Sequence, residues 1–472
     1  MAKIHGMMDI GRRAMALNQT AIQTTSHNIT NKSTEGYSRQ TVDFSTNPSV
    51  GEGKFQIGTG ARLANISRVN NPWIEKQLEA QSSNFSRLDQ KTQSLARLEA
   101  TMNEQSVKGI NAAIGNFFNS FRELANTPES VVARTQVREA GLGLVKQFQE
   151  AHHQILNAQT DMNKQIEYSV AEVNALAKEL AITNEKIQRT EIGGANTAND
   201  ERDHRDALLK KLSEKIDISY AEDPKTGMIN VTAGKAVILV TGTTSSQIKT
   251  GRAPSGETMI LHELSPGGSQ VDITERFKQG QVGAAIEVRD VTTQSMIDGL
   301  NELAFNIANE VNRAHREGYD RQNVVGGNFF GLNNPNDSFD VSNWTVSQDI
   351  VKDVSRIAAA SKPNAPGDNS VANVIHSLQS QRFMDDGKYS FDDFYNAKVS
   401  EIGILAQRAN SEFDSQKNTL EQLQNIRESI SGVSLDEEAA KLIEYQKSYE
   451  ASARLVKTAD EMFDTILNLK RL

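Results

Sequence analysis

The sequence predicts a mainly α-helical, elongated protein of nested domains, with a small antiparallel β domain inserted near its middle and its two terminal coiled-coil helices paired. Three observations lead to this fold class. Apolar residues recur every seven positions near both ends of the chain, which is typical of coiled-coil seams. The same period extends over about 60 interior residues. Short β-prone runs separated by Gly, Pro and Ser begin near Ile216.

These patterns divide the chain into segments. We expect an N-terminal coiled-coil helix with an extended linker (1–70), the first half of a rod domain (71–215), the inserted β domain (216–285), the second half of the rod (286–431) and a C-terminal coiled-coil helix (432–472). Isolated helices are marginal in water until they pack. The two terminal helices should therefore pack on each other or on other copies of the chain.

The first helix starts near Met1 and carries a seam with strict heptad spacing. Its members are Met8, Met15, Ile22 and Ile29. After the last of these the pattern stops, because Thr, Asn and Ser side chains compete with the helix for backbone hydrogen bonds. Gly36 then permits a positive φ. Residues 41–70 read as extended, with several glycines between short strands.

The rod helices follow from Asn71-Pro72, since proline is favoured in a first turn. A shorter helix ends near Asn126, and the longest one runs from near Ser130 to Gly193-Gly194. At roughly 1.5 Å per residue its length is about 90 Å. Candidate breaks near its start are Gly141 and Gly143, and the candidate cap of the next helix is Asn199.

From Ile216 to about Ala285, short β-prone runs separated by Gly, Pro and Ser replace the helical periodicity. The longest aliphatic run, residues 236–240, predicts a buried strand and is far too short to span a membrane. Helical periodicity returns near Met296, and a long helix is expected from Phe391 to about Ile430.

The last helix is predicted to begin at the sequence Ser-Leu-Asp-Glu, a capping box with Ser434 as N-cap and Glu437 at the third helical position. Its first seam consists of Leu435, Leu442, Tyr449, Val456 and Phe463. A second seam consists of Tyr445, Ser452, Ala459 and Ile466.

Composition narrows the possible functions. The 472 residues carry a net charge of -9 and contain no cysteine. A basic face is the usual footprint of nucleic-acid binding, so we expect no nucleic-acid partner. Disulfides and thiolate metal sites are excluded, and no membrane span is expected. The first residues lack the apolar region of a cleaved signal peptide.

No pattern predicts catalysis. The three Gly-Lys pairs lack the Ser or Thr of a phosphate-binding loop. The densest acidic cluster, between Asp200 and Asp206, includes two arginines, and the solvated first turns of a helix explain it better than a metal site does. We therefore expect no enzyme activity, no catalytic residues, no metal and no cofactor.

Residues 26–40 resemble the N-terminal signature of bacterial flagellar axial proteins, which are the rod, hook and hook-associated proteins. His27 and Glu35 depart mildly from the usual pattern. The matching residues are Asn28, Ile29, Asn31, Gly36, Tyr37, Arg39 and Gln40. In this group of proteins the terminal helices pack as concentric coiled coils, and the polar stretch turns the chain outward.

Other stretches make the chain similar to the hook-associated protein 1 family over nearly its whole length. They are NTPESVVARTQVREAG, RDHRDALLKKLSEKIDIS, KQGQVGAAIEVRD, GGNFF and the C-terminal stretch from Ser429 to Leu469. The resemblance implies a secreted structural adaptor of the flagellum that polymerises at the hook tip and joins hook to filament. Implied partners are other copies, hook protein below, and the next hook-associated protein and the filament above.

The resemblance further implies export through the flagellar channel without a cleaved signal peptide, and a cytosolic export chaperone on the C-terminal helix. Three alternatives remain open from the sequence. The first is another flagellar axial protein of hook, rod or filament type, and the second is a cytosolic coiled-coil scaffold. The third is an enzyme with an unrecognised site in the β domain.

Overall fold

The computed structural model describes residues 2–52, 55–102, 109–194, 196–235, 237–254, 256–263, 268–334 and 338–469. Its α-helices are α1 (Ala2–Thr30), α2 (Pro72–Met102), α3 (Ile110–Asn126), α4 (Val131–Glu191), α5 (Asn199–Lys215), α6 (Gly280–Glu287), α7 (Gln294–Arg316), α8 (Gln348–Lys352), α9 (Ser370–Ser377), α10 (Phe391–Ser431) and α11 (Leu435–Leu469). A π-helical segment, Val288–Thr293, joins α6 to α7.

The strands form small antiparallel sheets. They are β1 (Gln40–Thr46), β2 (Val50–Glu52), β3 (Phe55–Ile57), β4 (Ala61–Arg68), β5 (Ile218–Glu222), β6 (Ile229–Ala233), β7 (Val237–Thr241), β8 (Thr244–Ser245), β9 (Ile248–Arg252), β10 (Thr258–Glu263), β11 (Gln270–Asp272), β12 (Phe330–Leu332) and β13 (Trp344–Val346). The sheet orders are β1-β4, β2-β3, β5-β6-β7-β8, β11-β10-β9 and β12-β13. Residue 236, at the start of the predicted buried strand, lies outside the described residues.

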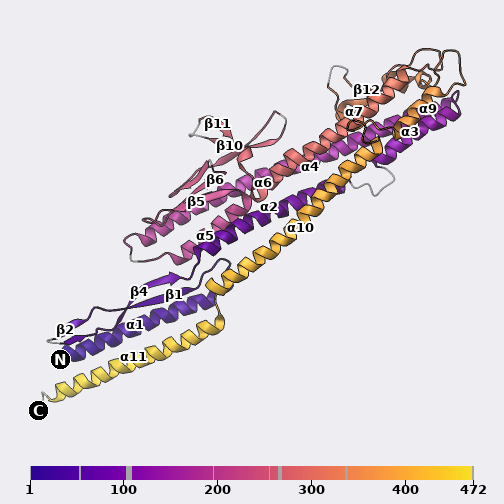
Figure 1. Cartoon of the computed structure of the whole chain (residues 1–472). Coiled ribbons are helices and arrows are strands. Elements are labelled where there is room, and N and C mark those ends of the chain that lie inside the picture. Colours follow the sequence, from indigo (N-terminus) through magenta and orange to yellow (C-terminus); the bar gives the residue numbers. More distant parts are fainter. Residues whose placement is uncertain are drawn as a thin grey trace.

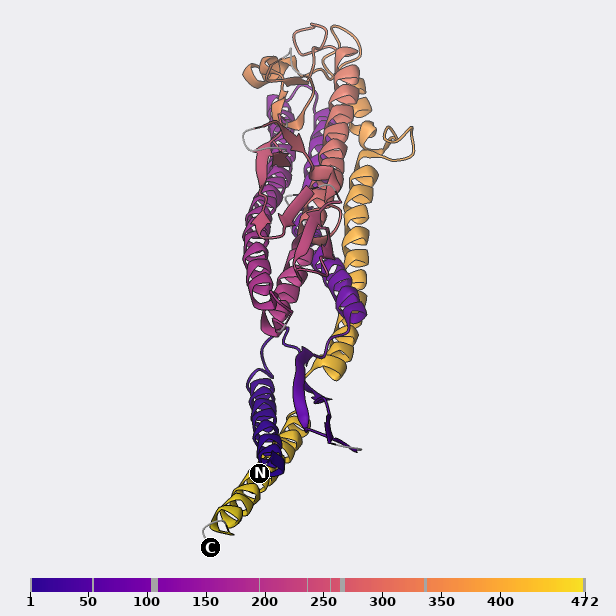
Figure 2. The same ribbon diagram turned by 90° about the vertical axis from the view of Figure 1, so that its left-hand side faces the viewer.

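The molecule is long and narrow (Figures 1 and 2). The terminal helices α1 and α11 lie at one end, and the rod of α2, α4, α7 and α10 extends away from them. The chain runs out through α2, comes back along α4, runs out again through α7, turns at the loops around α9 and returns through α10 (Figure 1). The nested, mainly helical fold with small antiparallel sheets is the one that the sequence predicts.

Helices α1 and α11 pack against each other in antiparallel orientation. His5 near the start of α1 meets Phe463 near the end of α11, with ring centroids 5.5 Å apart. At the other end of the pair, Asn28 bonds the carboxylate of Glu438. The chain therefore begins and ends at the same tip of the molecule (Figure 1).

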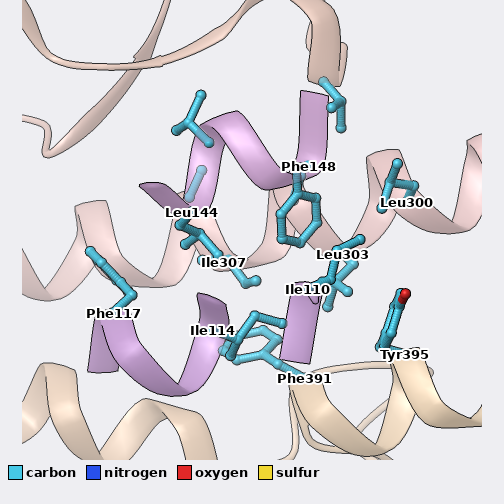
Figure 3. Close-up of a cluster of buried hydrophobic side chains, with 14 of the residues drawn as sticks. Ile110, Ile114, Phe117, Leu144, Phe148, Leu300, Leu303, Ile307, Phe391 and Tyr395 are labelled. Carbon is cyan, nitrogen blue, oxygen red and sulfur yellow. The ribbon is translucent and has the colours of Figure 1, made fainter. Parts of the chain in front are cut away.

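The first hydrophobic core fills the far half of the rod and joins α3, α4, α7, α9 and α10. Figure 3 shows its centre, where Phe117 and Ile114 of α3 face Leu144 and Phe148 of α4 and Leu303 of α7. These side chains recur at three- and four-residue intervals on their helices, so each helix presents one continuous apolar face to the others.

The second core lies near the middle of the molecule and is shared between helices and strands. Ile166 and Val173 of α4 and Leu209 of α5 pack in one cluster with Val231 of β6 and Ile260 of β10. Helix α6, which starts at Gly280 within the range predicted for the β domain, belongs to the same cluster. The strands thus cover the rod helices directly.

Two local predictions about the rod helices are wrong. Helix α4 runs unbroken through Gly141 and Gly143. Gly141 serves close packing, since a Cβ there would lie 2.8 Å from the ring of Phe329. Asn199 is the first residue of α5 rather than its cap, and its side-chain amide donates to the carbonyl of Ile66 at 2.7 Å. In the part of the chain that the structure describes, no helix has the length and apolarity to cross a membrane.

Candidate assembly site at the joint of the terminal helices

The loop between α1 and β1 forms a joint where the terminal helices meet the rod. It leaves α1 through backbone bonds from Asn31 to His27 and from Thr34 to Asn31, and it turns at Gly36, whose φ is +80°. A residue with a Cβ is strained at that φ, so the glycine is required by the turn. We call the contacts of residues 27–40 with α5, α10 and α11 the joint.

Asn28 lies at the centre of the joint and is only 1% exposed. Its Oδ1 accepts the hydroxyl of Tyr37 at 2.7 Å and the backbone N–H of Gln40 at 2.9 Å. Its Nδ2 donates to the carbonyl of Gln40 and to Oε2 of Glu438, both at 2.8 Å. Both ends of one buried amide are thus satisfied, and the four bonds tie α1 to β1 and to α11.

Tyr37 fills the space under the loop. Its ring is buried and meets the ring of His27 edge-on, with centroids 5.6 Å apart. Burial raises the pKa of the Tyr37 hydroxyl well above its usual value, and the negative charges of Asp200, Asp203 and Glu438 raise it further. The hydroxyl therefore stays protonated and acts as a donor to Asn28.

A buried ion-pair cluster holds the loop on α5. The backbone N–H of Ser38 donates to Oδ2 of Asp203 at 2.8 Å, and Arg68 of β4 pairs with the same carboxylate at 2.8 Å and with Asp206 at 2.7 Å. Burial raises the pKa of Asp203, while the bonds from Arg68 and Ser38 oppose that shift. Charge-assisted bonds of this kind, away from water, give the joint a defined geometry.

Arg39 and Gln40 connect the loop to three helices. The N–H of Arg39 donates to the carbonyl of Ser431, the last residue of α10, at 2.8 Å. Its guanidinium pairs with Glu437 of α11 at 2.8 Å. The Gln40 amide donates to Asp200 of α5 at 2.6 Å. The predicted capping box is therefore wrong for Glu437, whose carboxylate binds Arg39 across the joint.

Arg427 of α10 binds the backbone of the loop. Its Nη2 donates to the carbonyls of Gly36 at 2.9 Å and Tyr37 at 3.0 Å. It also pairs with Glu75 of α2 at 3.3 Å and with Glu428 at 2.8 Å. Burial lowers the pKa of Arg427, but the two carboxylates outweigh it and the pKa is raised, so the side chain remains a cation.

The structure brings most of the seven motif residues into the joint. Asn28, Gly36, Tyr37, Arg39 and Gln40 make the contacts above. Ile29 is half-buried, and the side chain of Asn31 bonds His27 within its own turn. Sequence reasoning missed their partners Asp203, Arg427 and Glu438, which lie 165, 390 and 410 positions away from the loop residues they bond.

The predicted seams lie along the contact between α1 and α11, but they are only partly covered. Met8, Met15 and Ile22 of α1 are half-buried, as are Leu442, Val456 and Phe463 of α11. Leu435 and Tyr449 of the first α11 seam remain exposed, at 43% and 36%. In the second seam Tyr445 and Ser452 are half-buried, Ala459 is buried, and Ile466 is exposed at 40%.

The joint has the chemistry of a mechanical connection. Its bonds are made between side chains and backbone of the same chain, and its carboxylates are paired with arginine, amide or backbone donors. Among the residues that the structure describes, no group of His, Cys, Asp and Glu is arranged to hold a metal ion.

Comparison with known proteins indicates the same group of flagellar proteins that the sequence resembles. The pattern described as flagellar hook-associated protein FlgK helical domain matches residues 95–330, which are 236 of the 472 residues. The pattern described as flagellar basal body rod FlgEFG protein C-terminal matches residues 427–469. The first match includes the end of α2, helices α3 to α7 and strands β5 to β11, and the second covers the end of α10 and α11.

Relatives align over nearly the whole chain. Flagellar hook-associated protein 1 of Bacillus subtilis is 27% identical, with 98% of this chain and 97% of the relative covered. The protein of that name from Escherichia coli is 26% identical, with 96% and 97% covered.

A solved structure of the flagellar hook junction protein FlgK from Burkholderia pseudomallei shares the fold. The TM-score is 0.69 and the identity 16%, over 75% of this chain and 100% of that chain. With a family match over half of the chain and relatives along its full length, the chain belongs to the flagellar hook-associated protein FlgK family.

Proposed function

We propose that this protein is a structural adaptor of the bacterial flagellum that polymerises at the hook tip and joins hook to filament. The observation that carries this function is the terminal helix pair, in which α1 covers only part of the apolar surface of α11. Leu435, Ile443 and Met462 are 43%, 59% and 46% exposed on that helix. Large apolar side chains left exposed along a paired helix are typical of a surface that other subunits cover.

The joint suits this role because it connects two parts with different tasks. The terminal pair provides contacts along an axial tube, and the bonds of Asn28, Asp203 and Arg427 hold the rod to it. In the proposed assembly, subunits contact one another through their terminal helices. Hook protein lies below this layer of subunits, and the next hook-associated protein and the filament lie above it. The division into residues 1–70, 71–215, 216–285, 286–431 and 432–472 is part of this proposal.

The route to the flagellum is proposed from the same features. A chain without cysteine carries no disulfides that would hinder passage unfolded through the flagellar channel. The exposed apolar residues of α11 are a suitable site for a cytosolic export chaperone, which would cover them before assembly. No cleaved signal peptide is needed on this route.

Electron microscopy of a strain lacking the gene tests the function. The expected result is complete hooks without filaments, with flagellin released into the medium, and restoration by the wild-type gene. Intact filaments in the deletion strain would contradict the proposal. Missing hooks would favour another axial protein. Normal flagella in the deletion strain, with the protein found in the cytosol of the wild-type strain, would favour the coiled-coil scaffold.

A further inference from the structure

A hairpin beside the terminal helices exposes large apolar side chains that its own chain covers only in part, as where the ring of Phe44 meets that of Tyr445 of α11 edge-on. In the ribbon of β1 and β4, Phe44 pairs across the strands with Leu63, and the two are 45% and 40% exposed. In the β2–β3 hairpin at its outer end, Val50 pairs with Ile57, at 60% and 46%. Phe55 is 77% exposed.

This hairpin has the composition of an interface. Residues 44–51 and 55–61 contain no Asp, Glu, Lys or Arg, and the segment 52–54 between them contains one residue of each charge, Glu52 and Lys54. Depletion of charge around aromatic and aliphatic side chains distinguishes interface cores from ordinary surface. A two-stranded hairpin is also marginally stable in water by itself, and one with exposed apolar side chains invites aggregation. Both points indicate that another surface covers it in the working state.

The position of the hairpin indicates where that surface lies. Figure 2 shows the outer end of the ribbon standing away from both terminal helices. The base of the hairpin is fixed, because a Cβ at Gly60 would lie 3.3 Å from Ile10 of α1. In the antiparallel pair, this part of α1 lies next to the Val456 region of α11, since Gly11 contacts Val456. The hairpin and the second half of α11 are therefore at one level along the axis.

That half of α11 carries a matching surface. At 3.6 residues per turn, Ala451, Leu455, Met462 and Ile466 fall within an arc of about 60°. The last three are 37%, 46% and 40% exposed. No charged residue between positions 448 and 466 falls in this arc. We call these four residues the α11 flank.

We propose that the β2–β3 hairpin of one subunit docks on the α11 flank of a second copy of this chain. The inference rests on the proposed polymerisation and adds a specific contact to it. Both surfaces expose apolar side chains at one level, and neither covers the other within the chain. A head-to-tail contact of this kind satisfies both surfaces in every subunit of a closed ring or helical layer.

The absence of cysteine allows a direct test. Two versions of the full-length protein, one Phe55→Cys and one Met462→Cys, are co-produced in a strain lacking the native gene, and flagella are oxidised after isolation. The expected product is a disulfide-linked dimer containing one of each version. The control replaces Met462→Cys by Ile192→Cys, which is on the rod and should give no such dimer. Cross-links of the Phe55→Cys chain only to a different axial protein, or none in assembled flagella, would overturn the proposal.

A second measurement uses matched serine variants, Phe55→Ser and Ile192→Ser, at positions 77% and 76% exposed. Phe55→Ser is expected to reduce the protein retained at hook tips roughly tenfold or more, as loss of a buried aromatic anchor does, while secretion and thermal unfolding stay as in wild type. Ile192→Ser should assemble normally. Wild-type assembly of Phe55→Ser would contradict the hairpin contact. Absence of the wild-type protein from hook tips would instead refute the proposed function.

Discussion

The rod and the terminal helix pair use apolar residues in opposite ways. In the rod, large side chains such as Phe117, Phe148 and Trp344 are completely buried. In residues 4–30 of α1 and 435–467 of α11, the buried apolar side chains are two alanines, Ala21 and Ala459. The rod therefore completes its core within one chain, whereas the terminal pair keeps its large apolar side chains at the margins of the contact.

Small residues explain how the pair can form without covering those side chains. A Cβ at Gly11 would lie 2.6 Å from the Val456 side chain, so glycine is needed for the close approach of α11. With Gly and Ala in the middle of the contact, Leu and Tyr side chains stand on either side of it. The comparison shows that stability of the fold and capacity for assembly reside in different parts of this chain.

The largest expected effect is on assembly. Val456 and Phe463 of α11 are half-buried against α1. Complete burial of such a side chain is worth roughly 1.5–3 kcal/mol. The double variant Val456→Asp, Phe463→Ser should lose up to roughly 3–6 kcal/mol, divided between the contact of α11 with α1 and its contacts with neighbouring subunits, and should be absent from hook tips. The main thermal transition should not move, because the rod does not use these residues. A melting temperature lowered by many degrees would show that α11 belongs to the folded core, and a block in secretion would identify an export site.

The second largest effect is expected on the stability of the rod. Phe117 meets the rings of Phe118, Phe121, Phe329 and Phe330 at centroid distances of 5.2–5.4 Å. Phe117→Ala should lower the free energy of unfolding by about 3–5 kcal/mol because of the cavity it leaves. Urea unfolding followed by circular dichroism measures this.

The control for that variant is Val132→Ala on the same rod, where the side chain is 69% exposed. It should change the free energy of unfolding by less than about 0.5 kcal/mol. Similar losses in the two variants would mean that the first core does not set the stability of the rod.

A third prediction concerns pH. His315 is completely buried, its Nδ1–H donates to the carbonyl of Gly327 at 2.7 Å, and its Nε2 accepts the N–H of Ala358 at 2.8 Å. Burial lowers the pKa of His315 to about 4; the bond to Gly327 opposes the shift and Arg134 adds to it. The unfolded chain binds a proton near pH 6.5, so this contribution is complete above pH 6.5 and is lost as the pH falls towards 4.

The expected loss is on the order of 3 kcal/mol between those limits. Unfolding free energies of wild type and His315→Gln, measured at pH 7 and pH 4.5, should differ by less at the lower pH. Taking the difference between the two proteins removes the effect of carboxylates that titrate in both. A constant difference would show that the pKa of His315 is the same in the folded and unfolded chain, which would contradict the effect of burial.

The smallest effect is expected at the joint. Asn28→Ala leaves the Tyr37 hydroxyl without its acceptor and Glu438 without the Asn28 donor, which should cost about 1–3 kcal/mol in docking of the pair on the rod. Hydrogen exchange should become faster in α1 and α11 and stay unchanged in α4. The matched control is Asn31→Ala, whose side chain bonds only within its turn. Faster exchange throughout the rod would contradict a joint that acts locally.

Helices and their seams could be predicted from the sequence because they depend on local spacing. The period of Met8, Met15 and Ile22 predicts a helix wherever its partner lies. The turn at Gly36 could also be predicted, since it depends on one residue and its polar neighbours. These features require no knowledge of distant parts of the chain.

The partners in the joint could not be predicted, because they are set by long-range topology. Asp203 reads as an acid in the first turns of a helix, and its bonds to Ser38 and Arg68 exist only once α5 lies beside the loop. Glu437 fits a capping box locally, but Arg39 offers a charged partner across the joint. Gly141 is needed within its helix because the ring of Phe329, which is distant in sequence, packs against it.

The unbroken helix α4 has a consequence for how force passes through the molecule. Its residues 133–162 belong to the first core and 166–181 to the second, with one helical turn between them. No flexible linker separates the two cores along this helix, so a twist applied at one end is carried by consecutive backbone hydrogen bonds to the other. In a rotating assembly, α4 would transmit torque along the rod as a single shaft.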